Sequence, residues 1–109
     1  MNELEITRQF VEKITSTYKE YLSSITLFGS WAKGTQGPHS DIDLLVVMEA
    51  KERSVIDQIY QEVLEILLKY ELDISLKIYS LKQFNRLLEL GTPFITSIEK
   101  TGVKLWNKA

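Results

Sequence analysis

The sequence predicts a single domain of the α+β (mixed α/β) class, in which a small β-sheet is flanked by helices. Its 109 residues, 44% hydrophobic and 26% charged, suit one soluble globular domain with one modest core. Segments with apolar residues three and four apart alternate with short runs of β-favouring residues. One of these runs is almost continuously apolar, which is typical of a strand covered on both faces. We therefore expect residues 1–109 to form one domain.

The first half of the chain divides into four expected elements. Residues 3–21 carry the periodicity of an amphipathic helix, and residues 25–28 form a short β-rich run that stops at Gly29-Ser30. Residues 31–40 have loop chemistry after at most one helical turn. Residues 42–48 are the apolar strand, and Asp41 and Asp43 lie at its entrance.

The second half begins with the clearest helix of the sequence, residues 51–70. Its wide apolar stripe is expected to cover one face of the sheet, and it comprises Val55, Ile56, Ile59, Tyr60, Val63, Leu64, Leu67 and Leu68. Residues 72–79 alternate as a third strand with two different faces. Ser80 is expected to cap a helix that ends at Gly91, Pro93 to start a short one, and residues 102–106 to form a last strand.

Composition excludes several classes of function. The formal net charge is −2 and no block of lysine and arginine occurs, so capture of nucleic acid by charge alone is not indicated. The absence of cysteine excludes disulfides and thiol catalysis. The N-terminus lacks the pattern of a signal peptide, and no apolar run approaches the roughly 18 residues of a membrane span. A cytoplasmic protein that does not engage a membrane is expected.

Asp41 and Asp43 are the first candidates for chemistry. Two residues that are two apart on a strand point to the same face, so both carboxylates can hold one hard cation such as Mg²⁺. Alone, such a pair more often marks only the solvated end of a strand. Gly29-Ser30 after the preceding strand adds a place where backbone amides can approach a phosphate, although alone it fits an ordinary turn.

Three further polar residues are weighed beside this pair. Asp73 begins the polar face of the third strand and could complete the metal site or act as a general base, or simply be a turn aspartate. Lys77 shares that face and could meet a phosphate, although a solvated lysine is the simpler reading. His39, the only histidine, lies in the loop and is expected to be exposed.

Gly29-Ser30, followed after ten residues by Asp41-Ile42-Asp43 and an apolar strand, resembles the signature of the polymerase-beta-like nucleotidyltransferase superfamily. The order of the later elements is also similar, across nearly the whole chain. The greatest resemblance is to its minimal nucleotidyltransferases, the group that includes antitoxin partners of HEPN-domain toxins. The resemblance implies the nucleotidyltransferase fold.

The resemblance also implies roles for individual residues. Asp41, Asp43 and Asp73 would be catalytic and bind Mg²⁺, while Gly29, Ser30, Lys33 and Ser40 would contact the nucleotide. Many relatives carry arginine directly after Gly-Ser, whereas this chain has Trp31 there. Lys33 would replace part of that arginine's phosphate contact.

The implied function is magnesium-dependent transfer of AMP from ATP to an acceptor hydroxyl, on a HEPN-type toxin or through a homo-oligomer. Two alternatives stay open: a non-catalytic module that binds nucleotide or neutralises a partner, and a small-molecule or RNA nucleotidyltransferase that acts as an oligomer. Apolar residues near the C-terminus are expected to pack in the core, with a partner surface as the alternative; they are Phe94, Ile95, Ile98, Leu105 and Trp106.

Overall fold

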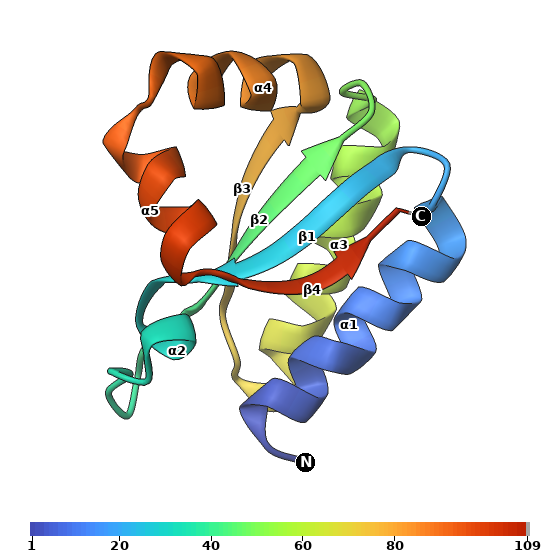
Figure 1. The fold of residues 1–109 in the computed structure, drawn as a ribbon. Coiled ribbons are helices and arrows are strands. Elements are labelled where there is room, and N and C mark those ends of the chain that lie inside the picture. Colours follow the sequence, from blue (N-terminus) through green and yellow to red (C-terminus); the bar gives the residue numbers. More distant parts are fainter. Residues whose placement is uncertain (109) are drawn as a thin grey trace.

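The computed structural model describes residues 1–108 and contains helices and strands in the predicted order (Figure 1). Its elements are α1 (Glu3–Tyr18), β1 (Leu22–Phe28), α2 (Gly29–Lys33), β2 (Ile42–Met48), α3 (Arg53–Tyr70), β3 (Ile74–Ser80), α4 (Leu81–Leu90), α5 (Pro93–Thr101) and β4 (Val103–Asn107). Each predicted element is present, and most boundaries differ from the prediction by only a few residues.

The four strands form one mixed sheet in the order β3-β2-β1-β4. β1 is antiparallel to both of its neighbours, while β2 and β3 are parallel because α3 carries the chain back between them. The resulting fold confirms the predicted α+β class, with a small mixed sheet flanked by helices.

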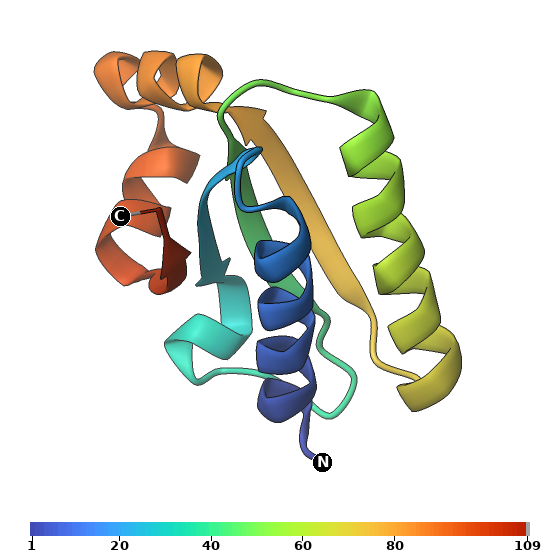
Figure 2. The same cartoon turned by 90° about the vertical axis from the view of Figure 1, so that its right-hand side faces the viewer.

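The helices lie in two layers, with α1 and α3 on one face of the sheet and α4 and α5 on the other (Figure 2). Alternate residues of β2 point to the two faces. Ile42, Leu44 and Val46 pack into the core beneath α1 and α3, while Leu45 and Val47 pack against Ile98 of α5. The prediction that this strand is covered on both faces is therefore confirmed.

The apolar stripe of α3 is only partly used as predicted. Val55, Ile59 and Val63 are buried against the sheet. Four other members of the predicted stripe are solvent exposed by 46%, 45%, 39% and 76%, and the prediction was wrong for them: Tyr60, Leu64, Leu67 and Leu68. Successive residues rotate by about 100° around a helix, so a stripe this wide extends beyond the side that a flat sheet can cover.

The C-terminal third confirms the predicted caps. The Ser80 hydroxyl accepts a hydrogen bond from the Gln83 amide while the Gln83 side chain accepts one from the Ser80 amide, so α4 begins with a capping box. Gly91 ends α4 in the left-handed conformation. Of the apolar residues expected in the core, Ile95 and Ile98 are buried, Trp106 is half-buried, and two are exposed: Phe94 and Leu105.

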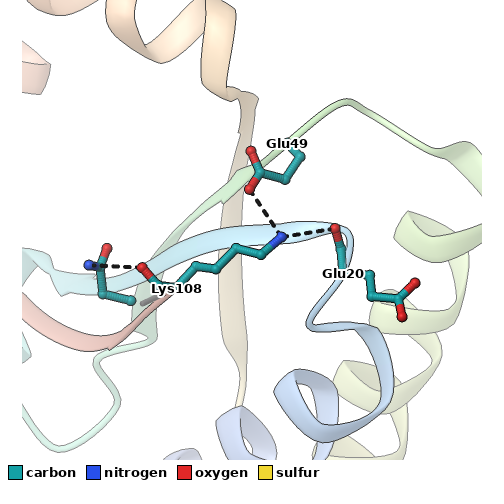
Figure 3. Close-up of polar contacts among 4 residues, drawn as sticks. Glu20, Glu49 and Lys108 are labelled. Atoms are coloured by element: carbon teal, nitrogen blue, oxygen red, sulfur yellow. Dashed lines mark hydrogen bonds and ion pairs between the residues drawn. The ribbon is translucent and has the colours of Figure 1, made fainter.

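Lys108, the last described residue, makes hydrogen bonds to residues next to the start of β1 and the end of β2. The Lys108 ammonium donates to the Glu49 carboxylate at 3.1 Å and to the Glu20 carbonyl at 3.2 Å (Figure 3). These side chains are exposed, so the ion pair contributes only about 0–1 kcal/mol. Among residues 1–108, no helix is both long and apolar enough to cross a bilayer.

Gly102 permits the close approach of the end of α5 to β1. A Cβ atom at this position would lie 2.6 Å from the Ile98 carbonyl oxygen and 2.8 Å from the Thr26 methyl group. Backbone and a buried side chain cannot move away without disturbing the sheet. The absence of a side chain at residue 102 is therefore a condition for adding β4 beside β1.

We predict that Gly102→Ala lowers the free energy of unfolding by about 1–3 kcal/mol, because the added methyl group overpacks this junction. Urea unfolding measures the change. Gly37→Ala is the matched control, since its nearest neighbour to an added Cβ is the Ser40 hydroxyl at 3.7 Å. Equal stability of the Gly102→Ala and Gly37→Ala proteins would contradict this account of the junction.

Candidate active site

Asp41 and Asp43 lie where β2 begins. Asp41 immediately precedes the strand and is exposed, while Asp43 is its second residue and is half-buried between Phe28 of β1 and Ser75 of β3. Burial, and secondly the nearby charge of Asp41, raise the pKa of the Asp43 carboxyl above its usual 3.8. A cation bound between the two carboxylates would reduce the repulsion between them.

Gly29 brings the first half of the predicted motif against the second. Its φ angle is +74°, a conformation that residues with a side chain rarely adopt. A Cβ atom built at Gly29 would collide with the Asp43 carboxylate and lie 3.2 Å from its Cγ. The carboxylate thus occupies the space where any other residue would carry its side chain, and the backbone at the start of α2 lies directly beside it.

The loop that joins α2 to β2 is held by its own hydrogen bonds. Gly34 ends α2 with a φ angle of +73°, and its amide donates to the Ser30 carbonyl. The Trp31 indole N–H donates to the Ser40 carbonyl at 3.2 Å, while the Gly37 amide donates to the Ser40 hydroxyl at 2.8 Å. These contacts fix the residues directly before Asp41.

Trp31 belongs to the site although the sequence patterns did not predict a role for it. The family resemblance identified it only as the replacement for an arginine. Its ring packs against the hydrophobic core while its N–H closes the loop. A large aromatic residue in an otherwise small and polar loop is the one sequence signal that could have indicated this role.

Asp73 lies beside Asp41 on the neighbouring chain segment. It directly precedes β3, and its carbonyl accepts a hydrogen bond from the Ile42 amide at 3.0 Å. Asp41 and Asp73 line the same cleft of about 310 Å³, together with His39 and Ser40. The walls of this cleft come from the start of α1, the loop before β2 and the segment between α3 and β3.

The remaining candidates differ in how closely they approach this cleft. His39 is exposed, as predicted, and lies on the cleft wall. Ser40 already uses its hydroxyl oxygen to accept from Gly37, so its observed role is to shape the loop. Lys33 is exposed in the last turn of α2. Lys77 is exposed on β3 opposite Leu45, two residues along the strand from the level of Asp43.

The donor set suits a magnesium ion that is shared with phosphate. In the described part of the chain, no three histidine, aspartate or glutamate side chains gather closely enough to hold a metal by themselves. Asp41 and Asp43 are close enough for their charges to interact. Mg²⁺ is commonly held by one or two carboxylates plus substrate phosphates and water, so this pair fits the ion, and Asp73 at the neighbouring strand remains a predicted third ligand.

Comparison with known proteins agrees with this geometry. Residues 7–104 match the family model described as "Nucleotidyltransferase domain". A Methanocaldococcus jannaschii protein named "Putative protein adenylyltransferase" is 31% identical over 109 residues, covering 96% of this chain and all of that protein.

Two solved structures share the fold. A Sulfolobus solfataricus protein described as a "putative nucleotidyltransferase" superposes with a TM-score of 0.60 at 24% identity, covering 96% of this chain and 80% of its own. A chain from the complex of tri-AMPylated Shewanella oneidensis HEPN toxin with MNT antitoxin superposes with a TM-score of 0.52 at 15% identity, covering 95% and 72%.

The mixed sheet flanked by helices, with paired aspartates beside a glycine-led turn, is the fold of nucleotidyltransferases. The chain belongs to the nucleotidyltransferase domain family, and the solved structures that share its fold include a chain from a toxin–antitoxin complex. The resemblance noted from Gly29-Ser30 and Asp41-x-Asp43 is confirmed, and the protein is an enzyme of the nucleotidyltransferase class.

We predict that Gly29→Ala abolishes nucleotide transfer and lowers the free energy of unfolding by about 1–3 kcal/mol, because it combines an unfavourable φ angle with a collision at Asp43. Gly34→Ala is the matched control, since its φ angle is nearly the same but no atom lies within 4 Å of an added Cβ. Urea unfolding and a transfer assay measure both proteins. Equal loss of activity in the two variants would contradict a specific role for the contact with Asp43.

We further predict that Asp43→Asn stabilises the metal-free protein at neutral pH. The raised pKa means that the folded state holds the Asp43 proton more tightly than the unfolded chain does. The contribution of this group to stability is therefore greatest at low pH and falls as pH rises from about 3.9 through the raised value.

Urea unfolding in a chelating buffer at several pH values between 3.5 and 7.5 provides the measurement. The difference in unfolding free energy between Asp43→Asn and the native protein should increase with pH and then level off. Asp57→Asn, on the exposed surface of α3, removes the same charge without this burial. A difference that does not change with pH would contradict the prediction.

Proposed function

We propose that this chain transfers AMP from ATP to a hydroxyl group of a protein acceptor, with Mg²⁺ bound by Asp41 and Asp43. The observation that carries the proposal is the contact between Gly29 and the Asp43 carboxylate. It joins the backbone that would approach the triphosphate to the carboxylates that would hold the metal. An ion held by these carboxylates could therefore also neutralise phosphates bound at the adjoining turn.

The proposed nucleotide contacts come from α2 and the loop after it. Gly29 and Ser30 offer backbone and hydroxyl groups next to Asp43, and Lys33 supplies positive charge one turn further on. Ser40 would act by holding the loop that precedes Asp41, through its bond to Gly37. Placement and charge neutralisation are the main contributions that a protein makes to this type of reaction.

In the proposed reaction, an oxygen of the acceptor hydroxyl forms a bond to the α-phosphorus of ATP. The bond from that phosphorus to the bridging oxygen breaks, and pyrophosphate leaves. Asp73, at the cleft beside Asp41, would accept the hydroxyl proton. Bound Mg²⁺ supplies neutralisation of the charge that develops on the phosphate oxygens.

The choice of a protein acceptor rests on the similar proteins. The Methanocaldococcus relative carries the name of a protein adenylyltransferase, and the Shewanella complex contains an AMPylated HEPN toxin beside its antitoxin. The cleft that holds Asp41 and Asp73 provides the place where a side chain of a partner would enter. We therefore propose an antitoxin role, in which a HEPN-type partner receives the AMP group.

We predict that Asp41→Asn and Asp43→Asn each reduce AMP transfer by at least about 10²-fold, because each removes a ligand of the ion that neutralises the triphosphate. The measurement is transfer of label from α-labelled ATP to a HEPN-domain protein from the same genome. Calorimetric titration of ATP with and without Mg²⁺ measures binding separately. Asp57→Asn should leave both signals unchanged.

The two assays separate the parts of the proposal. Transfer that persists in either site variant would contradict the assignment of Asp41 and Asp43. ATP binding that needs Mg²⁺, together with labelling of RNA or a small molecule instead of the protein, would support the site and contradict the acceptor.

A further inference from the structure

One aromatic residue at the start of α5 is exposed, although the helix packs against the rest of the fold through other residues. Ile95 and Ile98 are buried, whereas the Phe94 side chain is 40% exposed. A single exposed apolar residue is common at a protein surface, so its exposure alone does not indicate a function. What distinguishes Phe94 is its position relative to the candidate active site.

Phe28 connects Phe94 to that site. The rings of Phe28 and Phe94 pack edge to face, with their centroids 5.5 Å apart and an angle of 87° between their planes. Phe28 is half-buried and packs against the cluster that contains Leu45 and Ile98. Its side chain therefore lies on the face of the sheet that α5 covers.

The Asp43 carboxylate lies on the same face of the sheet. Asp43 and Leu45 are two residues apart on β2, so their side chains point to the same side. Asp43 is also the partner of Phe28 where β1 pairs with β2. The Cβ atoms of directly opposed residues in such a pair are about 4.5–5.5 Å apart. Phe94, Phe28 and Asp43 therefore form a continuous row from α5 to the proposed metal site.

The row supplies what the proposed nucleotide contacts lack. Gly29, Ser30, Lys33 and Ser40 offer amide, hydroxyl and ammonium groups, which suit phosphates, and none of them has a flat apolar surface for a base. An edge-to-face contact covers at most one face of a ring, so the exposed Phe94 ring keeps at least one face free from Phe28. Aromatic rings bind nucleobases by stacking, because every base has a π face.

We propose that Phe94 forms the nucleobase subsite of this chain and stacks against the adenine of bound ATP, with Phe28 holding the Phe94 ring in place. The inference rests on the proposed function, because the triphosphate must lie at Gly29 and Asp43 for its base to reach α5. Both views of the fold show α5 next to α2, the helix that begins at Gly29 (Figure 1, Figure 2).

Calorimetric titration of the full chain with ATP and Mg²⁺ tests the subsite. Phe94→Ala should raise the Kd for ATP about 10-fold, because it removes the stacking surface. Phe94→Leu should raise it nearly as much, since leucine keeps apolar volume but has no flat ring. Phe94→Tyr keeps the ring and should bind ATP with a Kd within about 2-fold of the native value.

Inorganic tripolyphosphate with Mg²⁺ is the matched probe without a base. All three Phe94 variants should bind it like the native protein, which also verifies that their metal and phosphate site is folded. Tyr60→Ala is the matched control variant, because Tyr60 is an aromatic residue that is 46% exposed on α3, on the opposite side of the sheet (Figure 2). Its affinity for ATP should equal that of the native protein.

The two probes separate failure of the subsite from failure of the proposed function. Phe94→Ala and Phe94→Leu proteins that bind ATP like the native protein would overturn the subsite and leave the proposed function intact. Equal weakening of ATP and tripolyphosphate binding in these variants would also overturn it, because Phe94 would then support the phosphate site instead of the base. A native protein that binds neither probe would overturn both the proposed function and the subsite.

Discussion

The approach of the Asp43 carboxylate to the backbone of Gly29 is the constraint on which the site depends. It requires a residue without a side chain at the end of β1 and a left-handed φ angle where α2 begins. It also requires β1 and β2 to pair so that Phe28 and Asp43 are opposite each other. The first two conditions are met by glycine at residue 29 and the third by the pairing of the strands. The site forms only when all three are met.

Much of the sheet rests on the same pairing. The register that places Asp43 beside Gly29 also turns Leu45 and Val47 toward α5, while Leu44 and Val46 face α1 and α3. A shift of one residue would exchange these two sets and move a carboxylate into the core. The burial of the apolar residues on both faces therefore maintains the position of the Asp43 carboxylate.

Sequence patterns were sufficient for the elements because each has a clear local signal. The continuous run of residues 42–48, the Ser80 cap and the left-handed Gly91 are such signals. The exposure of Tyr60 and Leu68 was not predictable, since periodicity identifies the apolar side of a helix but not what covers it. The hydrogen bond from Trp31 to Ser40 depends on the folded path of the loop, which spacing alone does not reveal. The motif located Asp41 and Asp43, but the contact of the Asp43 carboxylate with Gly29 is evident only in the folded structure.

The position of β4 determines when the sheet can be completed. β1 lies near the start of the chain, yet one of its two neighbours is formed by residues 103–107. During synthesis, β1 and β2 can pair early, but the outer edge of β1 stays open until the final strand emerges. An open edge is a site where another chain can add in error. Addition of β4, which the junction at Gly102 and the Lys108 contacts hold in place, therefore replaces the seven-residue β1 as the edge of the sheet with a strand of five residues, which offers another chain less backbone to pair with.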